Sequence, residues 1–461
     1  ILDYNFCFST FESRYIKDQI MSDYVYGLNK SGLSVIKLLY NQKKIFDCWD
    51  DNIKIRHLAN KHITKLNLKK INQKNINLYK NIYLTPGISL NDKRFKNISN
   101  SKIKRDLDLY YESLRDEKII AITGTNGKST TTKLIGDILK KKYRKTFVGG
   151  NLGEPLCNSI KKSFKYTHHV VELSSFQLET IKRFNPNISV ILNLSKDHLD
   201  RYKNIKNYIL AKKNILNNGG KNINLISIDD VYSNRIFLDK KINNKISFST
   251  KKITADIFYN KDCIIDNYFH KNKKIKLLNL SLDLNNSYNL QNILVSYIVC
   301  KYFKIPIKYF NESIKNFKGL PYRSLTIHNS KSKLIINNSK ATNISSSLST
   351  LENKKNIYLI LGGIAKEDGF HRFNKFKKNI DQIYIYGKSR LKIKHQINLS
   401  KISIIKKNLQ EVINTLWNDL SDKNHKVTIV FAPACASFDQ FENFEKRGAY
   451  FNQLILNKLK K

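Results

Sequence analysis

The stretch that most restricts what this chain can fold into is an apolar run, residues 118–123 (KIIAIT), that leads into the glycine turn 124–129 (GTNGKS) and a helix-compatible segment. The backbone amides of such a turn, with the N-terminus of the next helix, can cradle phosphate groups. Lys128 can reach the outer phosphates, and the hydroxyl of Ser129 can coordinate Mg²⁺. The general phosphate-loop pattern has glycine where this chain has Ile122, so the match is incomplete. Because a strand precedes the turn, we interpret the segment as a nucleoside-triphosphate site formed by Gly124, Thr125, Asn126, Gly127, Lys128, Ser129 and Thr130.

Short apolar runs that end in Gly, Asn or Ser alternate with amphipathic stretches along the rest of the chain. This alternation is typical of parallel α/β units, which bind their ligands at the carboxyl ends of the strands. We expect strands at residues 118–123, 169–173, 188–194, 224–228, 356–361, 383–386 and 427–431.

A chain of 461 residues is too long for one ordinary core. We predict an α/β fold of three domains: a Rossmann-like N-terminal domain at 21–114, a central P-loop-type ATPase domain with a mostly parallel sheet at 115–319, and a Rossmann-like C-terminal domain at 320–461. Residue 1 is Ile and the only methionine is Met21, so we interpret residues 1–20 as an N-terminal extension without a function of its own.

The formal net charge of +45 arises from 82 Lys and Arg residues against 37 Asp and Glu residues. A nucleic-acid-binding protein would carry such a charge, but the lysines are spread over the whole length among many Asn and Ile residues. An AT-rich coding sequence produces that composition in any protein, so we expect no nucleic-acid partner. No stretch reaches the ~20 apolar residues needed to span a bilayer, and the six scattered cysteines form no CxxC pair. We therefore expect a cytoplasmic protein with reduced thiols and no membrane insertion.

The segment GTNGKST at 124–130 closely resembles the nucleotide loop of the Mur ligases and of the related folylpolyglutamate synthases. The resemblance extends over nearly the whole chain and narrows to the branch of the Mur ligases that adds D-glutamate. ELSSFQLE at 172–179 and PACASFDQFENFEKRG at 433–448 carry this narrower likeness and argue against the other branches, and LGGIAK at 361–366 agrees with it. The resemblance implies ATP-dependent ligation of D-glutamate to UDP-N-acetylmuramoyl-L-alanine through an acyl phosphate, in cytoplasmic peptidoglycan precursor synthesis, by a protein that we expect to be a monomer.

By the same resemblance, Ser129 and Glu172, which ends the apolar run HVVEL, would bind one Mg²⁺ ion beside the ATP phosphates. His198, in the segment DHLD after the run ISVILNL, would bind a second Mg²⁺ ion. Lys212 matches the lysine that Mur ligases carbamylate, a reaction that needs an uncharged amine because only that form attacks CO₂. Lys213 is adjacent, so the register of this match stays open by one residue. The candidate catalytic residues are Lys128, Glu172, His198 and Lys212.

Three residues further along the chain would hold the ATP. Asn289 and Asn292 resemble the family's HNxxN segment, whose second Asn reads the adenine, and Arg323 remains available for phosphate. Tyr288 and Tyr322 stand where the family has His, and they keep an aromatic ring for packing or stacking.

Residues 27–32 (GLNKSG) follow an apolar run and resemble a dinucleotide fingerprint in which Asn29 replaces the central glycine. Asp51 lies about 20 residues further on, where an acidic residue would meet a ribose or base. Read alone, this pattern suggests an NAD site; beside the ligase motifs it resembles the UDP-binding domain. Asn151, in a segment similar to the family's NIG, would contact the muramoyl group. Arg105 stands where the family has glycine, which leaves the shape of its loop open.

In the last domain the resemblance implies a site for D-glutamate. Thr342, Lys366, Ser437 and the neighbourhood of Phe444 would bind its carboxylates, since a cation and hydroxyl donors suit a dianionic amino acid. Asn338 stands where the family has the Asp that holds the ATP ribose, so an amide here would weaken or alter that contact.

Two other classes of function stay open at the level of the sequence. The replacements at Tyr288, Tyr322 and Asn338 would also suit a nucleotide-sugar-binding homologue that has lost catalysis. The positive charge would suit a nucleic-acid binder, which predicts salt-sensitive duplex binding uncoupled from ATP.

Overall fold

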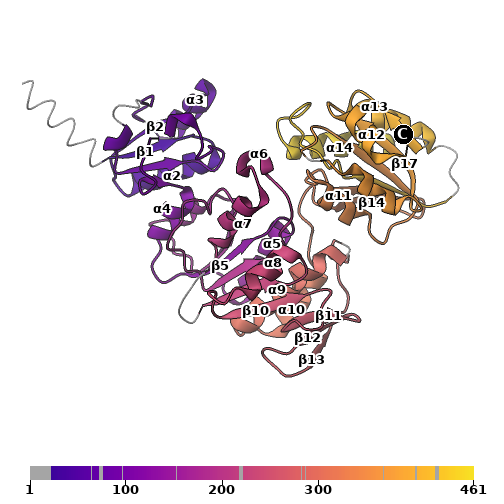
Figure 1. Ribbon diagram of the computed structural model, residues 1–461, viewed down its shortest axis with the longest axis horizontal. Coiled ribbons are helices and arrows are strands. Elements are labelled where there is room, and N and C mark those ends of the chain that lie inside the picture. Colours follow the sequence, from indigo (N-terminus) through magenta and orange to yellow (C-terminus); the bar gives the residue numbers. More distant parts are fainter. Residues whose placement is uncertain are drawn as a thin grey trace, which may run out of the picture. The chain divides into compact units, whose positions relative to one another are not determined.

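The computed structural model describes residues 22–460 except 64, 72–75, 96, 152, 217–221, 282, 286, 367, 400–401 and 421–424, so the predicted extension at 1–20 lies outside the described residues. The chain forms three mostly parallel sheets, which confirms the α/β fold class (Figure 1). It divides into two compact units, residues up to 274 with 294–306, and residues 275–293 with 307–461. The boundaries predicted for the three domains stay a prediction.

The first sheet has the strand order β2-β1-β3-β4, and all its pairs are parallel. Its strands are β1 (Asp23–Tyr26), β2 (Phe46–Trp49), β3 (Asn81–Leu84) and β4 (Ile103–Lys104), and its helices are α2 (Lys30–Asn41), α3 (Ile53–His62) and α4 (Asp106–Glu112). α2 is amphipathic and buries Val35, Ile36, Leu38 and Leu39, so its apolar stripe packs into the core that also holds Val25 and Tyr83 of the sheet.

The central sheet has the order β13-β12-β11-β10-β9-β8-β5-β7-β6. Its strands are β5 (Lys118–Thr123), β6 (Thr146–Gly150), β7 (His168–Glu172), β8 (Ile188–Ile191), β9 (Ile223–Ser227), β10 (Lys245–Ser249), β11 (Ile257–Asn260), β12 (Cys263–Asp266) and β13 (Lys273–Lys276). The helices along this part of the chain are α5 (Lys128–Lys142), α6 (Leu199–Tyr202), α7 (Ile205–Lys213), α8 (Val231–Leu238), α9 (Leu290–Tyr302) and α10 (Ile307–Lys315). The strands from β6 to β11 pair in parallel, which places their carboxyl ends at one edge.

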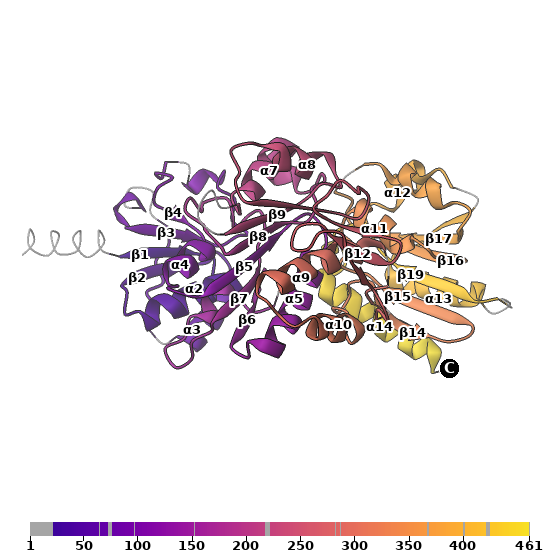
Figure 2. The same ribbon diagram turned by 90° about the horizontal axis from the view of Figure 1, so that it is seen from below.

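The third sheet has the order β14-β15-β19-β16-β17-β18, and only the β14–β15 pair is antiparallel. Its strands are β14 (Leu325–Asn329), β15 (Lys333–Asn337), β16 (Ile357–Gly362), β17 (Ile380–Tyr386), β18 (Ser403–Ile405) and β19 (Val427–Phe431). Helices α11 (Ile344–Leu351) and α12 (Arg390–Ile397) share one apolar core with the sheet, and α13 (Leu409–Asp419) and α14 (Phe444–Leu459) share the other (Figure 2). Helices on both faces of a parallel sheet are the Rossmann-like arrangement.

All seven strands expected from the sequence are present, with ends that shift by a few residues. The largest shifts are of three residues: β17 begins at Ile380 instead of residue 383, and β8 ends at Ile191 instead of residue 194. The next residues follow β5 into the phosphate loop: Leu192 N donates to Thr123 O (3.1 Å) at the end of β5, and Asn193 O accepts from Thr125 N (2.8 Å) of the loop. Among the described residues, no helix is both long and apolar enough to cross a membrane.

Candidate active site

The phosphate loop leaves the central sheet between two parallel neighbours. β5 pairs with β7 on one side and with β8 on the other, and its buried residues carry the chain to Gly124 at the carboxyl edge. Gly127 has a φ of 84°, a left-handed conformation that favours glycine, and α5 begins directly after it. The first turn of α5 leaves amide groups without intrahelical acceptors, which is the property that binds phosphate.

Lys128 is half-buried and lies against its own loop. Its Nζ donates to the carbonyl oxygens of Gly124 and Thr125, both at 2.9 Å. The ammonium group is therefore held where the loop curves, close to the place expected for the outer phosphates.

Asn193 stabilises the loop from the neighbouring strand, a role that the motif search missed. Its Oδ1 accepts from the amide of Asn126 (2.9 Å), its Nδ2 donates to the carbonyl of Asn126 (3.2 Å), and its own carbonyl accepts from the amide of Thr125 (2.8 Å). The only sequence signal was a polar residue inside the apolar run ISVILNL.

Ser129, Glu172 and Asn151 come together at the ends of α5, β7 and β6. The hydroxyl of Ser129 donates to Glu172 Oε2 (2.5 Å), and Asn151 Nδ2 donates to Glu172 Oε1 (2.8 Å). Glu172 is 1% exposed and Ser129 is also 1% exposed. A buried carboxylate with one hydroxyl beside it is the partial ligand set that Mg²⁺ uses when phosphate and water complete its shell.

Lys212 reaches the same loop from α7. The side chain is 2% exposed, and its Nζ donates to Gly124 O (2.8 Å) and Thr123 Oγ1 (3.1 Å). Burial, reinforced by the charge of Lys128, holds the pKa of Lys212 well below its usual value, against the opposing charges of Asp197 and Glu172.

Lys213 has different surroundings, since its Nζ pairs with Asp239 (2.6 Å) and its side chain is 35% exposed. Of the two lysines between which the sequence left the register open, Lys212 is therefore the one at the phosphate loop.

His198 lies just before α6 in a left-handed conformation with a φ of 53°. Its amide donates to Asp197 Oδ1 (2.9 Å), and its ring packs edge-on against Phe176 and lies 6.3 Å from the ring of Tyr208. Tyr208 in turn lies 4.9 Å from Lys212 Nζ. His198 and Lys212 thus share one aromatic neighbour.

Among the residues described, there is no group of three or more His, Cys, Asp or Glu side chains that could enclose a metal ion. The donor set still fits Mg²⁺, because this ion usually takes one or two carboxylates and completes its shell with phosphate oxygens and water.

The turn expected to bind UDP closes around two glycines. A Cβ on Gly32 would lie 1.8 Å from the carbonyl oxygen of Gly27, so only glycine fits at position 32. Asp50 fixes the turn, because its Oδ2 accepts from the amide of Leu28 (2.8 Å).

The two predicted UDP contacts lie beside this turn. Asn29 precedes α2 with a φ of −66°, so the position does not need glycine, and its side chain forms no cap and is exposed. Asp51 accepts from the hydroxyl of Tyr26 (2.6 Å) and from Arg94 (2.7 Å), and these two contacts hold its pKa below the usual value.

The residues expected at the adenine belong to the second unit. Asn289 and Asn292 are buried, with Asn292 Nδ2 donating to Asn289 Oδ1 (2.7 Å) and Asn289 Nδ2 donating to Asp283 O (2.8 Å). Arg323 is half-buried and follows Tyr322, whose φ is 62°. The side chain of Tyr288 lies outside the described residues.

The four residues expected at D-glutamate lie in the second unit, three of them on loops and one at the start of a helix. Thr342 follows β15, Lys366 follows β16, and Ser437 follows β19, so all three lie past the carboxyl ends of neighbouring parallel strands. Phe444 begins α14, and its ring lies 4.0 Å from Lys340 Nζ. Lys366 is exposed and Ser437 is buried.

Arg447 ties these loops together and was missed by the sequence reasoning. The side chain is fully buried, donates to Ser339 O (2.7 Å) and Oγ (3.0 Å), and also donates to Cys435 O (3.0 Å) and Gly362 O (3.4 Å). Its position inside the segment FENFEKRG was the available signal.

Asn338 turns inward instead of presenting its amide at the surface. It is 5% exposed, and its Nδ2 donates to Thr350 Oγ1 (2.7 Å) of α11. The amide therefore takes part in the packing of α11.

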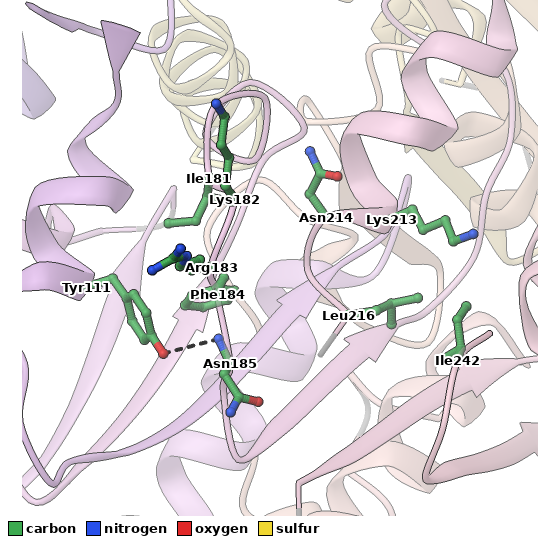
Figure 3. A pocket seen from close by; sticks show the side chains of 10 residues that line it. All are labelled: Tyr111, Ile181, Lys182, Arg183, Phe184, Asn185, Lys213, Asn214, Leu216 and Ile242. Carbon is green, nitrogen blue, oxygen red and sulfur yellow. Dashed lines mark hydrogen bonds between the residues drawn. The ribbon is translucent and has the colours of Figure 1, made fainter. Parts of the chain in front are cut away.

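A cavity of 470 Å³ lies elsewhere in the first unit (Figure 3). It is lined by Tyr111, Ile181, Lys182, Arg183, Phe184, Asn185, Lys213, Asn214, Leu216 and Ile242. Apart from Lys213, the register alternative to Lys212, none of these is a candidate site residue.

Residues 122–300 match the Mur ligase middle domain. The UDP-N-acetylmuramoylalanine–D-glutamate ligase of Rickettsia prowazekii (strain Madrid E) is 34% identical over 434 residues, 93% of this chain and 96% of the relative. The ligase of the same name from Rickettsia bellii (strain RML369-C) is 35% identical over 439 residues, with the same two shares. The chain therefore belongs to the UDP-N-acetylmuramoylalanine–D-glutamate ligase branch of the Mur ligase family, as its motifs indicated.

Solved structures agree at the level of the fold. A pseudomurein peptide ligase type C from Methanothermus fervidus aligns with a TM-score of 0.58 at 18% identity over 95% of this chain and 99% of its own. The UDP-N-acetylmuramate-alanine ligase MurC from Thermotoga maritima aligns with a TM-score of 0.56 at 16% identity, with the same coverage.

Proposed function

We propose that this protein joins the amine of D-glutamate to the alanine carboxylate of UDP-N-acetylmuramoyl-L-alanine, with conversion of ATP to ADP and phosphate, in the cytoplasmic synthesis of peptidoglycan precursors. The observation that carries the proposal is the cluster of Lys128, Ser129, Glu172 and Lys212 around one phosphate loop. The two relatives that align over 93% of this chain are ligases whose names state this pair of substrates.

The reaction takes place in two steps. An oxygen of the alanine carboxylate attacks the γ-phosphorus, the bond to ADP breaks, and an acyl phosphate forms. The amine of D-glutamate then attacks the acyl carbon, phosphate leaves with the bonding electron pair, and the amine loses a proton.

Lys128 and the amides of the loop orient the phosphates for the first step. Glu172 and Ser129 would hold one Mg²⁺ ion, and His198 with Lys212 a second; bound Mg²⁺ would lessen the repulsion between carboxylate and phosphate. We propose that Lys212 carries a carbamate, because burial lowers its pKa and so favours the neutral amine, the form that reacts with CO₂.

The remaining predicted residues take the rest of the substrates. Asn29, Asp51 and Asn151 would contact the UDP-sugar, and Asn289, Asn292 and Arg323 the ATP. Thr342, Lys366, Ser437 and Phe444 would contact D-glutamate. The protein would act as a monomer and without nucleic acid.

Phosphate release tests the proposal. The protein should release phosphate from ATP only when UDP-N-acetylmuramoyl-L-alanine and D-glutamate are both present, and Glu172→Gln should lower kcat at least about 100-fold. Glu154→Gln removes an exposed carboxylate from the same domain and should leave kcat unchanged. Equal activity with L-glutamate or meso-diaminopimelate would contradict the assignment.

A nucleotide-sugar-binding protein without catalysis is the second candidate. The inward position of Asn338, where the family has an Asp for the ribose, favours it. This candidate would be supported instead if the protein bound UDP-N-acetylmuramoyl-L-alanine tightly but released no phosphate from ATP with any amino acid tested.

A further inference from the structure

Arg105 is a fully buried charged side chain that the mechanism above does not use. It is 0% exposed and stands where the family has glycine. Burial of a guanidinium group is costly unless its donors are satisfied and its charge is paired. Its contacts therefore indicate what the replacement does.

Arg105 joins the first sheet to the central domain. Its Nη1 donates to the carbonyl oxygens of Leu84 (2.9 Å) and Thr85 (2.8 Å), and its Nη2 donates to Glu179 Oε2 (2.6 Å). Leu84 ends β3, whereas Glu179 ends the ELSSFQLE segment that begins with Glu172. One side chain thus connects the loop after β3 with the segment after β7.

Arg201 forms the matching half of this arrangement. It donates to both oxygens of Glu179 (2.7 and 3.1 Å) and to the carbonyls of Pro86 (2.7 Å) and Ile88 (3.1 Å). Four carbonyl groups of residues 84–88 are therefore held by two guanidinium groups that share one carboxylate. Glu179 is 9% exposed and Arg201 10% exposed at the side chain, so solvent weakens these contacts little.

The two ends of the cluster lie beside the two ends of the proposed substrate site. At one end, Thr85 N donates to Tyr26 O (3.1 Å), and a Cβ on Gly27 would lie 2.2 Å from Thr85 Oγ1. The loop at residues 84–88 therefore packs directly on the turn expected to bind UDP. At the other end, the guanidinium of Arg201 lies 3.9 Å from the ring centre of Phe176, which packs edge-on against His198.

We propose that Arg105, Glu179 and Arg201 form a positioning cluster that sets the separation between the UDP end and the reacting end of UDP-N-acetylmuramoyl-L-alanine. The proposal rests on the proposed function. A substrate held at both ends reacts only when the two subsites are the correct distance apart, and the cluster connects the elements that carry them. The planar guanidinium suits this role because its two terminal nitrogens reach two carbonyls on one side and a carboxylate on the other, whereas an ammonium group presents all its donors from one atom.

This role is tested by comparing UDP, which needs only one subsite, with UDP-N-acetylmuramoyl-L-alanine, which needs both. In Arg105→Gly, we expect the Kd for UDP and for ATP to stay within about twofold. We expect kcat/KM for UDP-N-acetylmuramoyl-L-alanine to fall about tenfold or more, since a misplacement of ~1 Å is enough. Arg144→Gly removes an exposed arginine of the central domain and serves as the matched control.

Glu179→Gln and Arg105→Lys keep the volume of the site and serve if Arg105→Gly does not fold. Both should lower kcat/KM for the full substrate more than they weaken UDP binding, and Arg105→Lys should retain more activity than Arg105→Gly. An equal loss for UDP and for the full substrate in these variants would show a general structural role and overturn the proposal, as would no loss for either. If the unsubstituted protein bound UDP but released no phosphate with the full substrate set, the proposed function would fail instead.

Discussion

Lys212 and Lys213 are neighbours in the sequence, but their amines lie in different surroundings. Burial lowers the pKa of Lys212, whereas Lys213 forms an ion pair with Asp239 (2.6 Å). A neutral amine can react with CO₂, and an amine held in an ion pair is protected from this reaction. At this scale, position within the fold distinguishes two residues that are chemically identical in the sequence.

We predict that activity depends on dissolved CO₂ through Lys212. Protein kept in CO₂-depleted buffer should lose activity, and bicarbonate should restore it. Lys212→Gln should lower kcat about 100-fold or more and show no response to bicarbonate. Turnover in both buffers and ¹³C NMR with labelled bicarbonate measure the effect.

Lys213→Gln is the control for this experiment, since it removes an amine one position away and should keep both activity and the response to bicarbonate. Full activity of Lys212→Gln would contradict the prediction.

β7 carries a pH-sensitive residue near one end and Glu172 at the other. Burial lowers the pKa of His169 from 6.5 to about 4, and the hydroxyl of Tyr110 lies 2.9 Å from its Nδ1. The unfolded chain therefore binds a proton more readily than the folded chain between these two pH values. Stability from this group is present above about pH 6.5 and is lost as the pH falls towards 4.

We predict that the free energy of unfolding falls by up to about 3 kcal/mol between pH 6.5 and pH 4 because of His169. Urea unfolding at several pH values should show a smaller slope in His169→Gln than in the unsubstituted protein. His57→Gln changes an exposed histidine of α3 and should leave the slope as it is. Identical slopes in all three proteins would rule out this assignment.

α5 lies close to β6 because of one glycine. A Cβ on Gly136 would lie 2.4 Å from Val148 Cγ2 of β6, a distance that packed atoms do not adopt. Although alanine favours a helix more than glycine does, the overlap should dominate at this position.

We predict that Gly136→Ala lowers the free energy of unfolding by about 1–3 kcal/mol. Val148→Ala removes the overlapping methyl groups, so the double variant should be less destabilised than the sum of the two single variants. Urea unfolding of the four proteins measures this coupling. Additive effects would mean that the helix moves away from β6 without strain.

The sequence allowed the phosphate loop to be predicted because its residues are contiguous and each contributes through the backbone or an adjacent side chain. The seven strands could be predicted for a similar reason, since a buried parallel strand appears as an apolar run. Asn193 and Arg447 could not be predicted, because each acts through partners that are distant in the sequence. Which of Lys212 and Lys213 lies at the phosphate loop could also be seen only in the tertiary structure, because the difference between them is one of burial.

The charge of the whole molecule acts on its substrates. A formal net charge of +45 over 461 residues gives the molecule a net positive field. ATP, the UDP-sugar and D-glutamate are all anions, so the field raises their local concentration without distinguishing between them.

We predict that salt weakens the apparent affinity for all three substrates. Raising the ionic strength from about 0.05 M to about 0.3 M shortens the Debye length, so each KM should rise several-fold while kcat changes little. Steady-state kinetics with each substrate varied in turn measures the effect. A KM that is independent of salt for ATP would show that only local contacts attract it.

Arg447 has a consequence for how the choice of amino acid can change. One side chain bonds to the loops after β15 and β19 and to Gly362, the last residue of β16, so the shapes of these three segments depend on one another. If only one of these segments were replaced by its counterpart from a ligase with another amino-acid preference, the hydrogen-bond acceptors of Arg447 would no longer match its donors. For the proposed D-glutamate site, a change of amino-acid preference would therefore require matched replacement of all three segments that Arg447 connects.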